Sequence, residues 1–298
     1  MVDDIFEDMS QERLDLSLNI DQMPARDVVR LILEQDALVP AAVAAEADRI
    51  ARAVEQIAER LANGGKLVYV GAGTSGRIAM LDAAELPPTY GVPSTLVSVM
   101  LAGGTDAFLN AVEGAEDDDE AAIAEVNQRV TAEDAVVGIA ASGTTPYTVA
   151  AIRRANMIGA LTVAITSVAG SPLAAEADIA ITPQTGPEVI MGSSRMKSGT
   201  AQKLVLNAIS TGVMIRLGKV YSNLMTEMPA TNEKLRSRAV RMVELVAGVP
   251  RPIAAQAFRD AGGEVKVASV MARRKLAADQ ARALLERHGG SLREALES

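Results

Sequence analysis

Two short segments of the sequence combine glycine with closely spaced hydroxyl side chains. The segment 71–76 reads "GAGTSG" after the apolar run "KLVYV", and the segment 141–146 reads "ASGTTP" after "DAVVGIA". Each segment joins a predicted strand to a predicted helix. Backbone N–H groups at a helix N-terminus, together with Ser and Thr hydroxyls, suit a phosphate monoester. The candidate binding residues are Thr74, Ser75, Ser142, Thr144 and Thr145.

The spacing of Gly71, Gly73 and Gly76 also fits the G-x-G-x-x-G pattern of dinucleotide-binding turns. Such a site needs an acidic residue at the end of the next strand, where it binds the ribose hydroxyls. The next predicted strand, 94–100, is followed by "LAGGTDAF" and has no acid at its tip. We therefore expect a phosphate site and no NAD or other cofactor. The simpler alternative is two ordinary strand–helix turns with Ser and Thr caps.

Few residue types are available for acid–base chemistry. The sequence has no Cys and a single His, His288, which precedes a Gly-Gly pair and is predicted to end a helix. Thiol catalysis, Ser-His-Asp catalysis and a metal site are therefore not expected. Proton transfer would have to come from carboxylates, Lys or Tyr.

The local sequence gives different interpretations for two glutamates and identifies neither as catalytic. Glu85 precedes Leu86-Pro87, where proline is expected to end a helix, and both a fixed site residue and a surface residue fit there. Glu116 opens the acidic run 116–120, for which a solvated helix N-terminus is the better interpretation.

The surrounding elements predict an α/β fold. Residues 24–62 show helical apolar spacing and end at Asn63-Gly64-Gly65. Short apolar runs, separated by helical segments, then follow at 66–70, 94–100, 134–141, 161–166 and 177–182. This alternation predicts a parallel sheet covered by helices on both faces. Both hydroxyl-rich segments would then converge at the carboxyl ends of the strands.

The last part of the chain has a different pattern. No strand pattern remains after about residue 222, and the segments 258–270 and 285–296 both read as helix, Gly-Gly, helix. We expect a small C-terminal helical bundle. The predicted division is a helical segment at 1–62, an α/β domain with the two phosphate loops at 63–222 and the bundle at 223–298.

Charge and hydropathy limit the partners. The formal net charge of -9 argues against a nucleic-acid partner, which requires clustered Lys and Arg. The chain begins with the acidic "MVDDIFEDMS", unlike a secretory signal, and no run approaches the ~20 apolar residues of a membrane span. We therefore expect a soluble, cytoplasmic protein.

Four long motifs carry a family resemblance: "GAGTSGRIAMLDAAELPPTYG" (71–91), "AGGTDAFLNAVEGAED" (102–117), "GPEVIMGSSRMKSGTAQK" (186–203) and "ATNEKLRSRA" (230–239). Over nearly its whole length the chain resembles the N-acetylmuramic acid 6-phosphate etherases and the related glucokinase regulatory protein. Both contain the sugar isomerase domain, a three-layer α/β fold. The chain departs from the etherase pattern at "SQERL" (10–14) for Thr-Glu-x-x-Asn, at Leu86 for Cys and at Thr144 for Arg.

The resemblance implies roles for several residues. Glu85 and Glu116 match the catalytic pair of the etherases, while Asp117 to Glu120 stay surface residues. Ser194 and Arg195 would complete a sugar pocket that is composite across a homodimer. Glu116 would be the base at C2 of the sugar, and Glu85 the acid that protonates the departing lactate.

The implied reaction removes the D-lactyl ether of N-acetylmuramic acid 6-phosphate by β-elimination and hydration. Its products are N-acetylglucosamine 6-phosphate and D-lactate, in cell-wall amino-sugar recycling. A non-catalytic phosphosugar regulator and an aldose–ketose phosphosugar isomerase are the two alternatives. The regulator resembles two tandem copies of this module, whereas this chain has one, and the isomerase would release no lactate.

Overall fold

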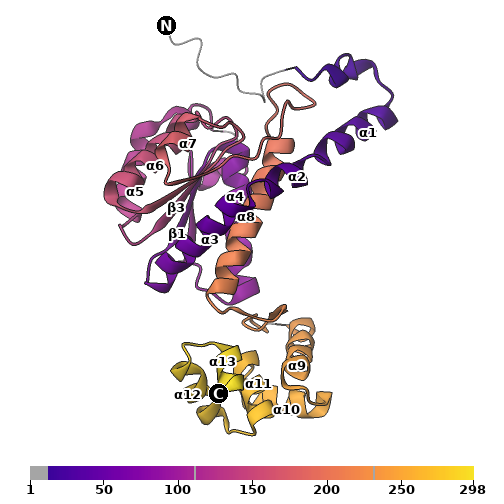
Figure 1. Ribbon diagram of the computed structural model, residues 1–298, viewed down its shortest axis with the longest axis vertical. Helices are drawn as coiled ribbons and strands as arrows, with labels where there is room; N and C mark the ends of the chain where they lie inside the picture. The colour runs from indigo at the N-terminus through magenta and orange to yellow at the C-terminus, as the bar shows by residue number, and fades with distance from the viewer. Residues whose placement is uncertain (1–12, 111, 231) are drawn as a thin grey trace. The chain divides into compact units, whose positions relative to one another are not determined.

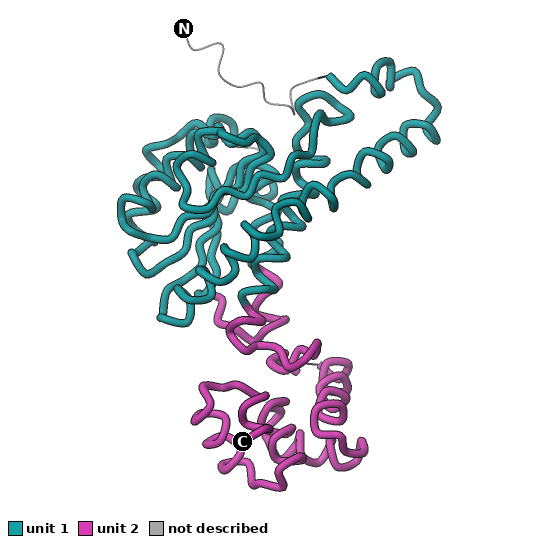
Figure 2. Tube along the Cα trace, viewed as in Figure 1, with its two compact units in different colours: residues 1–83, 95–213 teal, residues 84–94, 214–298 magenta. Residues whose placement is uncertain are grey.

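The computed structural model describes residues 13–110, 112–230 and 232–298. The chain forms two compact units, which Figure 2 shows in different colours. The first comprises residues 1–83 and 95–213, and the second comprises residues 84–94 and 214–298. Each unit has its own core. The predicted domain boundaries, after residues 62 and 222, stay a prediction.

A five-stranded parallel sheet forms the centre of the first unit, with the strand order β2-β1-β3-β4-β5. The strands are β1 (Leu67–Gly71), β2 (Val97–Leu101), β3 (Ala135–Ile139), β4 (Leu161–Ile165) and β5 (Ile179–Ile181). Each overlaps a strand that the sequence predicts. The central strands β1, β3 and β4 are buried along their whole length, as their continuous apolar runs indicate.

Helices cover both faces of this sheet (Figure 1). One layer contains α5 (Asp119–Arg129), α6 (Pro146–Ile158) and α7 (Pro172–Glu176). The other contains α3 (Ala47–Ala62) and the first-unit parts of α4 (Gly73–Tyr90) and α8 (Lys197–Arg216). Helix α6 packs on β1, β3 and β4, and α3 packs on β3, β4 and β5. The predicted three-layer fold is confirmed.

The predicted N-terminal helical segment consists of several helices. Two 3-10 turns, η2 (Asp15–Ser17) and η3 (Ile20–Gln22), precede α1 (Ala25–Asp36), α2 (Val39–Ala44) and α3. Helix α1 buries only Leu31 and Gln35, one turn apart. Helix α3 ends at Ala62, directly before the Asn-Gly-Gly stop that the sequence predicts.

A buried carboxylate joins three elements of the first unit. Asp82 on α4 accepts a hydrogen bond of 2.9 Å from the Tyr69 hydroxyl of β1. Asp82 also accepts hydrogen bonds from two residues of α8, Asn207 Nδ2 at 2.6 Å and Ser210 Oγ at 3.0 Å. Burial, and secondarily the Asp82 charge, raises the pKa of Tyr69 well above its usual value. This network holds β1 against the two helices on one face of the sheet.

The second unit contains the predicted C-terminal helices, together with a short strand at 224–225 that lies beyond residue 222, where no strand is predicted. A two-stranded hairpin, β6 (Val220–Tyr221) and β7 (Leu224–Met225), precedes α9 (Glu233–Ala247), α10 (Arg251–Asp260), α11 (Val265–Arg274), α12 (Ala278–Arg287) and α13 (Leu292–Glu297). Its core includes Phe258, Val270 and Leu284. The segment 258–270 is helical on both sides of its Gly-Gly pair, within α10 and α11, as the sequence predicts.

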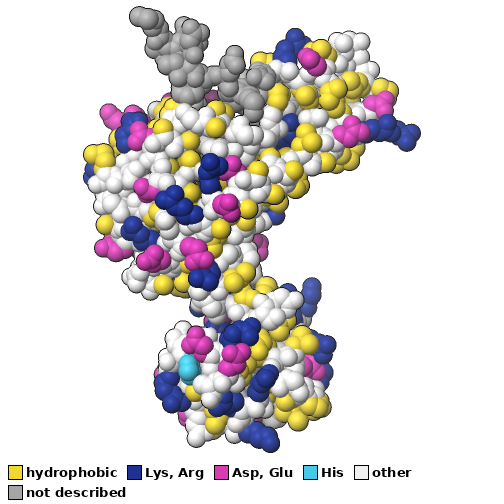
Figure 3. Space-filling model, viewed as in Figure 1, with side chains coloured by type: hydrophobic (Ala, Val, Ile, Leu, Met, Phe, Trp, Pro, Cys, Tyr) yellow, Lys and Arg dark blue, Asp and Glu magenta, His cyan; other side chains and the backbone are white. Residues whose placement is uncertain are grey.

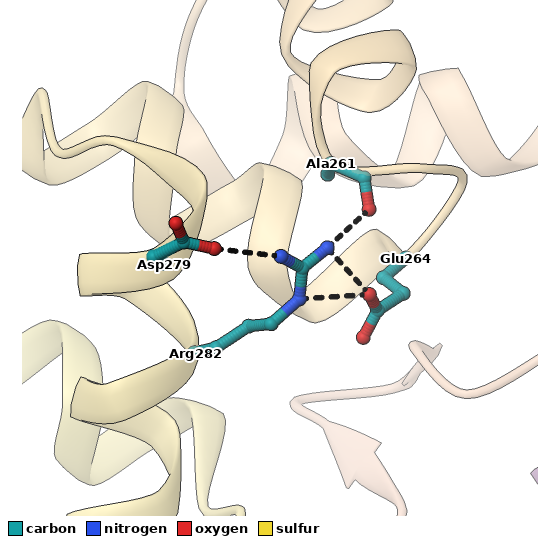
Figure 4. A network of polar contacts seen from close by, with 4 residues as sticks. All are labelled: Ala261, Glu264, Asp279 and Arg282. Atoms are coloured by element: carbon teal, nitrogen blue, oxygen red, sulfur yellow. Dashed lines mark hydrogen bonds and ion pairs between the residues drawn. The ribbon is translucent and has the colours of Figure 1, made fainter.

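Both predicted Gly-Gly turns are present in this bundle. Gly262-Gly263 separates α10 from α11, and Gly289-Gly290 separates α12 from α13. Arg282 of α12 joins the first turn to α12 by donating to the carbonyl of Ala261 at 3.2 Å and to Glu264 at 2.9 Å (Figure 4). His288 lies at the C-terminal cap of α12, as predicted.

Candidate functional site

The strand order places a topological switch point between β1 and β3, because β1 continues to β2 on one side and β3 to β4 on the other. Ligands of open parallel sheets bind beyond the carboxyl ends of the strands at such a point. A cavity of about 340 Å³ opens there. Its lining residues are Ala72, Gly73, Thr74, Ser75, Glu116, Asp117, Ile139, Ala140, Ala141, Ser142, Thr144, Thr145, Pro146 and Ser194.

The first hydroxyl-rich loop reaches the cavity because α4 begins at Gly73, directly after β1. Thr74 and Ser75 therefore lie in the first turn of α4, where backbone N–H groups lack helical partners. Gly76 allows the helix to approach the strand end closely. A Cβ at Gly76 would lie 2.8 Å from the Gly71 carbonyl oxygen and 2.3 Å from Leu101 Cδ1.

The second loop presents its hydroxyls at the start of α6. Ser142 Oγ lies 2.9 Å from Thr144 Oγ1 and accepts the backbone N–H of Thr144 at 3.2 Å. Thr145 is the N-cap residue of α6. Gly143 has a φ of 69°, and a Cβ there would lie 2.1 Å from Ser171 Oγ, so the loop conformation requires glycine. The structure thus brings both predicted phosphate loops to one cavity.

Glu116 reaches the same cavity from a neighbouring segment. It lies in the 3-10 turn η5 (Ala115–Asp117), immediately before α5. Asp118 caps α5 by accepting the backbone N–H of Ala121 at 2.8 Å. The acidic run therefore divides, since its later members serve the helix N-terminus while Glu116 faces the cavity. Asp117, a surface residue according to the family resemblance, is exposed and also lines the cavity.

Glu85 occupies a different setting from the one expected. Helix α4 does not end before Pro87 but continues through both prolines to Tyr90. Leu86 is 2% exposed and Tyr90 is 8% exposed. Their burial offsets the backbone hydrogen bonds that the two prolines cannot make. Glu85 is exposed within the segment 84–94 of the second unit, and the structure does not place it among the residues that line the cavity.

Of the two residues predicted in the "GSSRMKSGTAQK" motif, only Ser194 lines the cavity, and Arg195 is exposed outside the lining set. The turn that carries Ser194 precedes α8, and the Ser194 carbonyl accepts the backbone N–H of Gly199 at 2.9 Å. The carboxylate of Glu188, which is fully buried, accepts the backbone N–H groups of Lys197 and Ser198, each at 3.0 Å. Glu188 thus fixes the start of α8 next to Ser194.

Lys197 is also buried, and its ammonium donates to Gln35 Oε1 of α1 at 3.1 Å. Burial lowers the pKa of Lys197, against the opposing effect of the Glu188 charge. Neither Glu188 nor Gln35 is predicted from the sequence. No local pattern predicts the hydrogen bonds between Glu188 and the start of α8, because they depend on the folded path of residues 188–197.

A smaller cavity of about 180 Å³ adjoins the first. The two cavities share Ala72, Gly73 and Glu116 in their walls. The remaining lining residues of the smaller cavity are Arg77, Ala102, Ala107, Asn110, Val112, Glu113, Gly114 and Ala115. Glu116 therefore stands between a hydroxyl-rich cavity and a second, partly apolar one.

Comparisons with known proteins identify the family. The glucokinase regulatory protein N-terminal SIS domain model matches residues 49–156, and the SIS domain model matches residues 110–211. The N-acetylmuramic acid 6-phosphate etherase of Symbiobacterium thermophilum is 58% identical over 88% of this chain and 87% of its own length. That of Clostridium beijerinckii is 47% identical over 97% of this chain and 95% of its own. The chain belongs to the N-acetylmuramic acid 6-phosphate etherase family.

Solved structures share the fold of this chain. The phosphoheptose isomerase of Francisella tularensis superposes with a TM-score of 0.53 at 20% identity, and covers 65% of this chain and all of its own. That of Neisseria gonorrhoeae gives a TM-score of 0.51 at 19% identity, with 64% and 99% coverage. At these identities the comparison concerns the fold alone. The predicted sugar isomerase fold is confirmed.

The departures from the etherase pattern fall in different places. Residues 10–12 of the "SQERL" segment lie outside the described residues. Leu86 is buried in α4, where an apolar side chain takes the place of the usual Cys. Thr144 lies at the cavity, so the arginine usual in the etherases is replaced here by a neutral hydroxyl.

Proposed function

We propose that this chain cleaves the D-lactyl ether of N-acetylmuramic acid 6-phosphate, giving D-lactate and N-acetylglucosamine 6-phosphate. Its relatives are named for that etherase activity over nearly the whole chain. The observation that carries the proposal is the cavity at the switch point, which combines two hydroxyl-rich helix N-termini with the carboxylate of Glu116. The hydroxyls and backbone N–H groups bind the 6-phosphate, and the carboxylate faces the sugar.

The proposed reaction begins with proton removal from the open-chain form of the sugar. Glu116 removes the proton from C2, and the electron pair is delocalised onto the C1 aldehyde. The electron pair then expels the lactyl oxygen from C3, which leaves a C2–C3 double bond. A second acid protonates that oxygen as D-lactate departs. Water then adds, with its oxygen at C3 and a proton returned to C2, to give the product.

We assign the second acid to Glu85. The support is the match of "DAAELPPTYG" to the etherase motif. In this role Glu85 protonates the departing lactate and then, as the carboxylate, removes a proton from the incoming water. The remaining site residues of the proposal are Thr74, Ser75, Ser142, Thr144, Thr145, Ser194 and Arg195.

The proposal includes a homodimer with a composite site. Helix α1 buries only Leu31 and Gln35, whereas Val29, Leu33 and Leu38 are 54%, 62% and 55% exposed. Hydrophobic side chains also reach the surface along α1 and α2 in Figure 3. Apolar side chains grouped in this way favour a protein partner, here a second copy of the chain.

The proposed setting is the cytoplasm, where the enzyme would take part in recycling cell-wall amino sugars. None of the helices in the described part of the chain combines the length and apolar character needed to cross a membrane.

The deciding experiment is incubation with N-acetylmuramic acid 6-phosphate in ¹⁸O-labelled water, followed by mass spectrometry. Elimination and hydration predict unlabelled D-lactate and a product that carries the label at C3. Binding of the phosphosugar without release of lactate would contradict the etherase proposal and favour a regulator. Conversion to a ketose without lactate would favour an isomerase.

A further inference from the structure

The cavity of about 180 Å³ beside Glu116 has a different chemical character from the phosphate cavity. Its apolar lining consists of small side chains, namely Ala102, Ala107, Ala115 and Val112. Its polar lining residues are Asn110, Arg77 and Glu113. Such a lining can contact a methyl group while offering both a donor and an acceptor.

Arg77 gives this cavity a defined shape. From the first turns of α4, its Nε donates to the carbonyls of Ala107 at 3.1 Å and Phe108 at 3.0 Å. Its Nη2 donates to Ala107 at 2.9 Å and to Asn110 at 3.2 Å. One guanidinium therefore holds three carbonyls of the segment that begins with the 3-10 turn η4 (Thr105–Phe108) and leads toward Glu116.

We propose that this cavity is a specificity subsite for the C2 acetamido group of the sugar. The inference rests on the proposed function, in which Glu116 is the base at C2. The acetamido nitrogen is bonded to the carbon that loses its proton, so this substituent lies next to the base. Glu116 also borders both cavities, and the hydroxyl-rich one is taken by the phosphate end. The smaller cavity is therefore the place for the C2 substituent.

Position and lining favour the acetamido group over the lactyl group as the occupant. The acetamido nitrogen is bonded to C2 itself, whereas the lactyl oxygen is bonded to C3. The acetamido methyl also matches the small apolar side chains of this lining. The guanidinium of Arg77 is already engaged by backbone carbonyls. A volume of about 180 Å³ exceeds one water's share of the liquid, about 30 Å³, and leaves room for a substituent of this size.

The test uses binding without turnover, by calorimetry with N-acetylglucosamine 6-phosphate and glucose 6-phosphate. These ligands differ at C2, where the second has a hydroxyl. We expect the wild-type protein to prefer the acetamido sugar by about tenfold or more in Kd. Val112→Phe fills the cavity from a position that is 43% exposed. It should reduce that preference to about one, while the Kd for glucose 6-phosphate changes by less than about twofold.

Two further variants sharpen the result. Asn110→Ala removes an amide from the lining and should reduce the preference by roughly 3- to 10-fold. Leu109→Phe is the matched control, because Leu109 is 83% exposed on the same segment and is not among the residues that line the cavity. It should leave both affinities as in the wild-type protein.

An unchanged preference in both Val112→Phe and Asn110→Ala would overturn the subsite. It would also be overturned if Val112→Phe weakened binding of N-acetylmuramic acid 6-phosphate alone, measured in the Glu116→Gln background, since the lactyl group would then be the occupant. Failure of the etherase proposal has a separate signature, namely no release of lactate. The binding preference does not depend on that release.

Discussion

At the scale of single residues, the two glutamates should affect turnover far more than binding. Glu116→Gln and Glu85→Gln each keep the size of the side chain but remove its ability to exchange a proton. We expect each variant to lower kcat by ~10² or more, with the Kd for N-acetylglucosamine 6-phosphate almost unchanged. Steady-state release of lactate and calorimetry measure the two quantities.

The neighbouring acids provide the control for this pair. Glu120→Gln changes an exposed acid in the first turn of α5, outside the cavity lining, and should leave kcat within about twofold. Wild-type kcat in both glutamine variants would contradict the assigned roles. A loss confined to Glu116→Gln would leave Glu116 in place and require another acid for the departing lactate.

Residue chemistry explains which parts of the site were predictable. Thr74, Ser142 and Thr145 could be found because each follows a strand directly, and the fold brings the ends of parallel strands together. Glu116 required the family resemblance, since its local pattern favours a solvated helix N-terminus, and Ser194 came from the matching motif "GSSRMKSGTAQK". Glu188 and Arg77 were missed because their partners are backbone groups that only the folded path of the chain brings to them, so no spacing signal marks them in the sequence.

At the scale of elements, the Tyr69–Asp82 contact should contribute to stability in a pH-dependent way. Tyr69→Phe removes one of the donors to a buried carboxylate and should lower the free energy of unfolding by about 1–3 kcal/mol near neutral pH. The pKa of Tyr69 is raised in the folded state, so its contribution is full below the unfolded pKa of about 10. That contribution decreases as the pH rises toward the folded pKa.

Urea unfolding at several pH values checks this expectation. The difference in free energy between the wild-type protein and Tyr69→Phe should be constant up to about pH 9 and should narrow above about pH 10. A difference that stays constant, or widens, in the alkaline range would show that Tyr69 contributes by packing alone.

Helix α4 shows where reasoning from local sequence fails for an element. The five strands, the stop after α3 and the two Gly-Gly turns were predicted because apolar runs and glycine positions act locally. The end of α4 was predicted wrongly, because Pro87 and Pro88 disfavour a helix only within their own turn. Burial of Leu86 and Tyr90 on either side of the prolines is a tertiary effect, and it keeps the segment helical to Tyr90.

At the scale of the whole molecule, the apolar side chains of α1 predict assembly. Leu33→Glu places a carboxylate on the exposed apolar surface and should convert a dimer to a monomer at micromolar concentration, with a loss of activity because the proposed site is composite. Light scattering coupled to gel filtration measures the mass. Ala25→Glu adds the same carboxylate at an exposed position of α1 and should remain dimeric.

A dimer that survives Leu33→Glu with full activity would place the interface elsewhere. A wild-type protein that is monomeric at the concentration of the assay and still releases lactate would contradict the composite site itself.

The hydroxyl-rich cavity has a consequence for binding as salt changes. Its lining residues, all within the described part of the chain, include the carboxylates of Glu116 and Asp117 but neither Lys nor Arg, and Thr144 stands where the etherases usually have Arg. In the proposed binding mode neutral dipoles hold the phosphate, and the net charge of -9 repels it at long range. Ionic strength screens this repulsion and leaves short hydrogen bonds nearly untouched. Added salt should therefore assist the encounter with a phosphosugar, the opposite of its effect on sites built from cationic side chains.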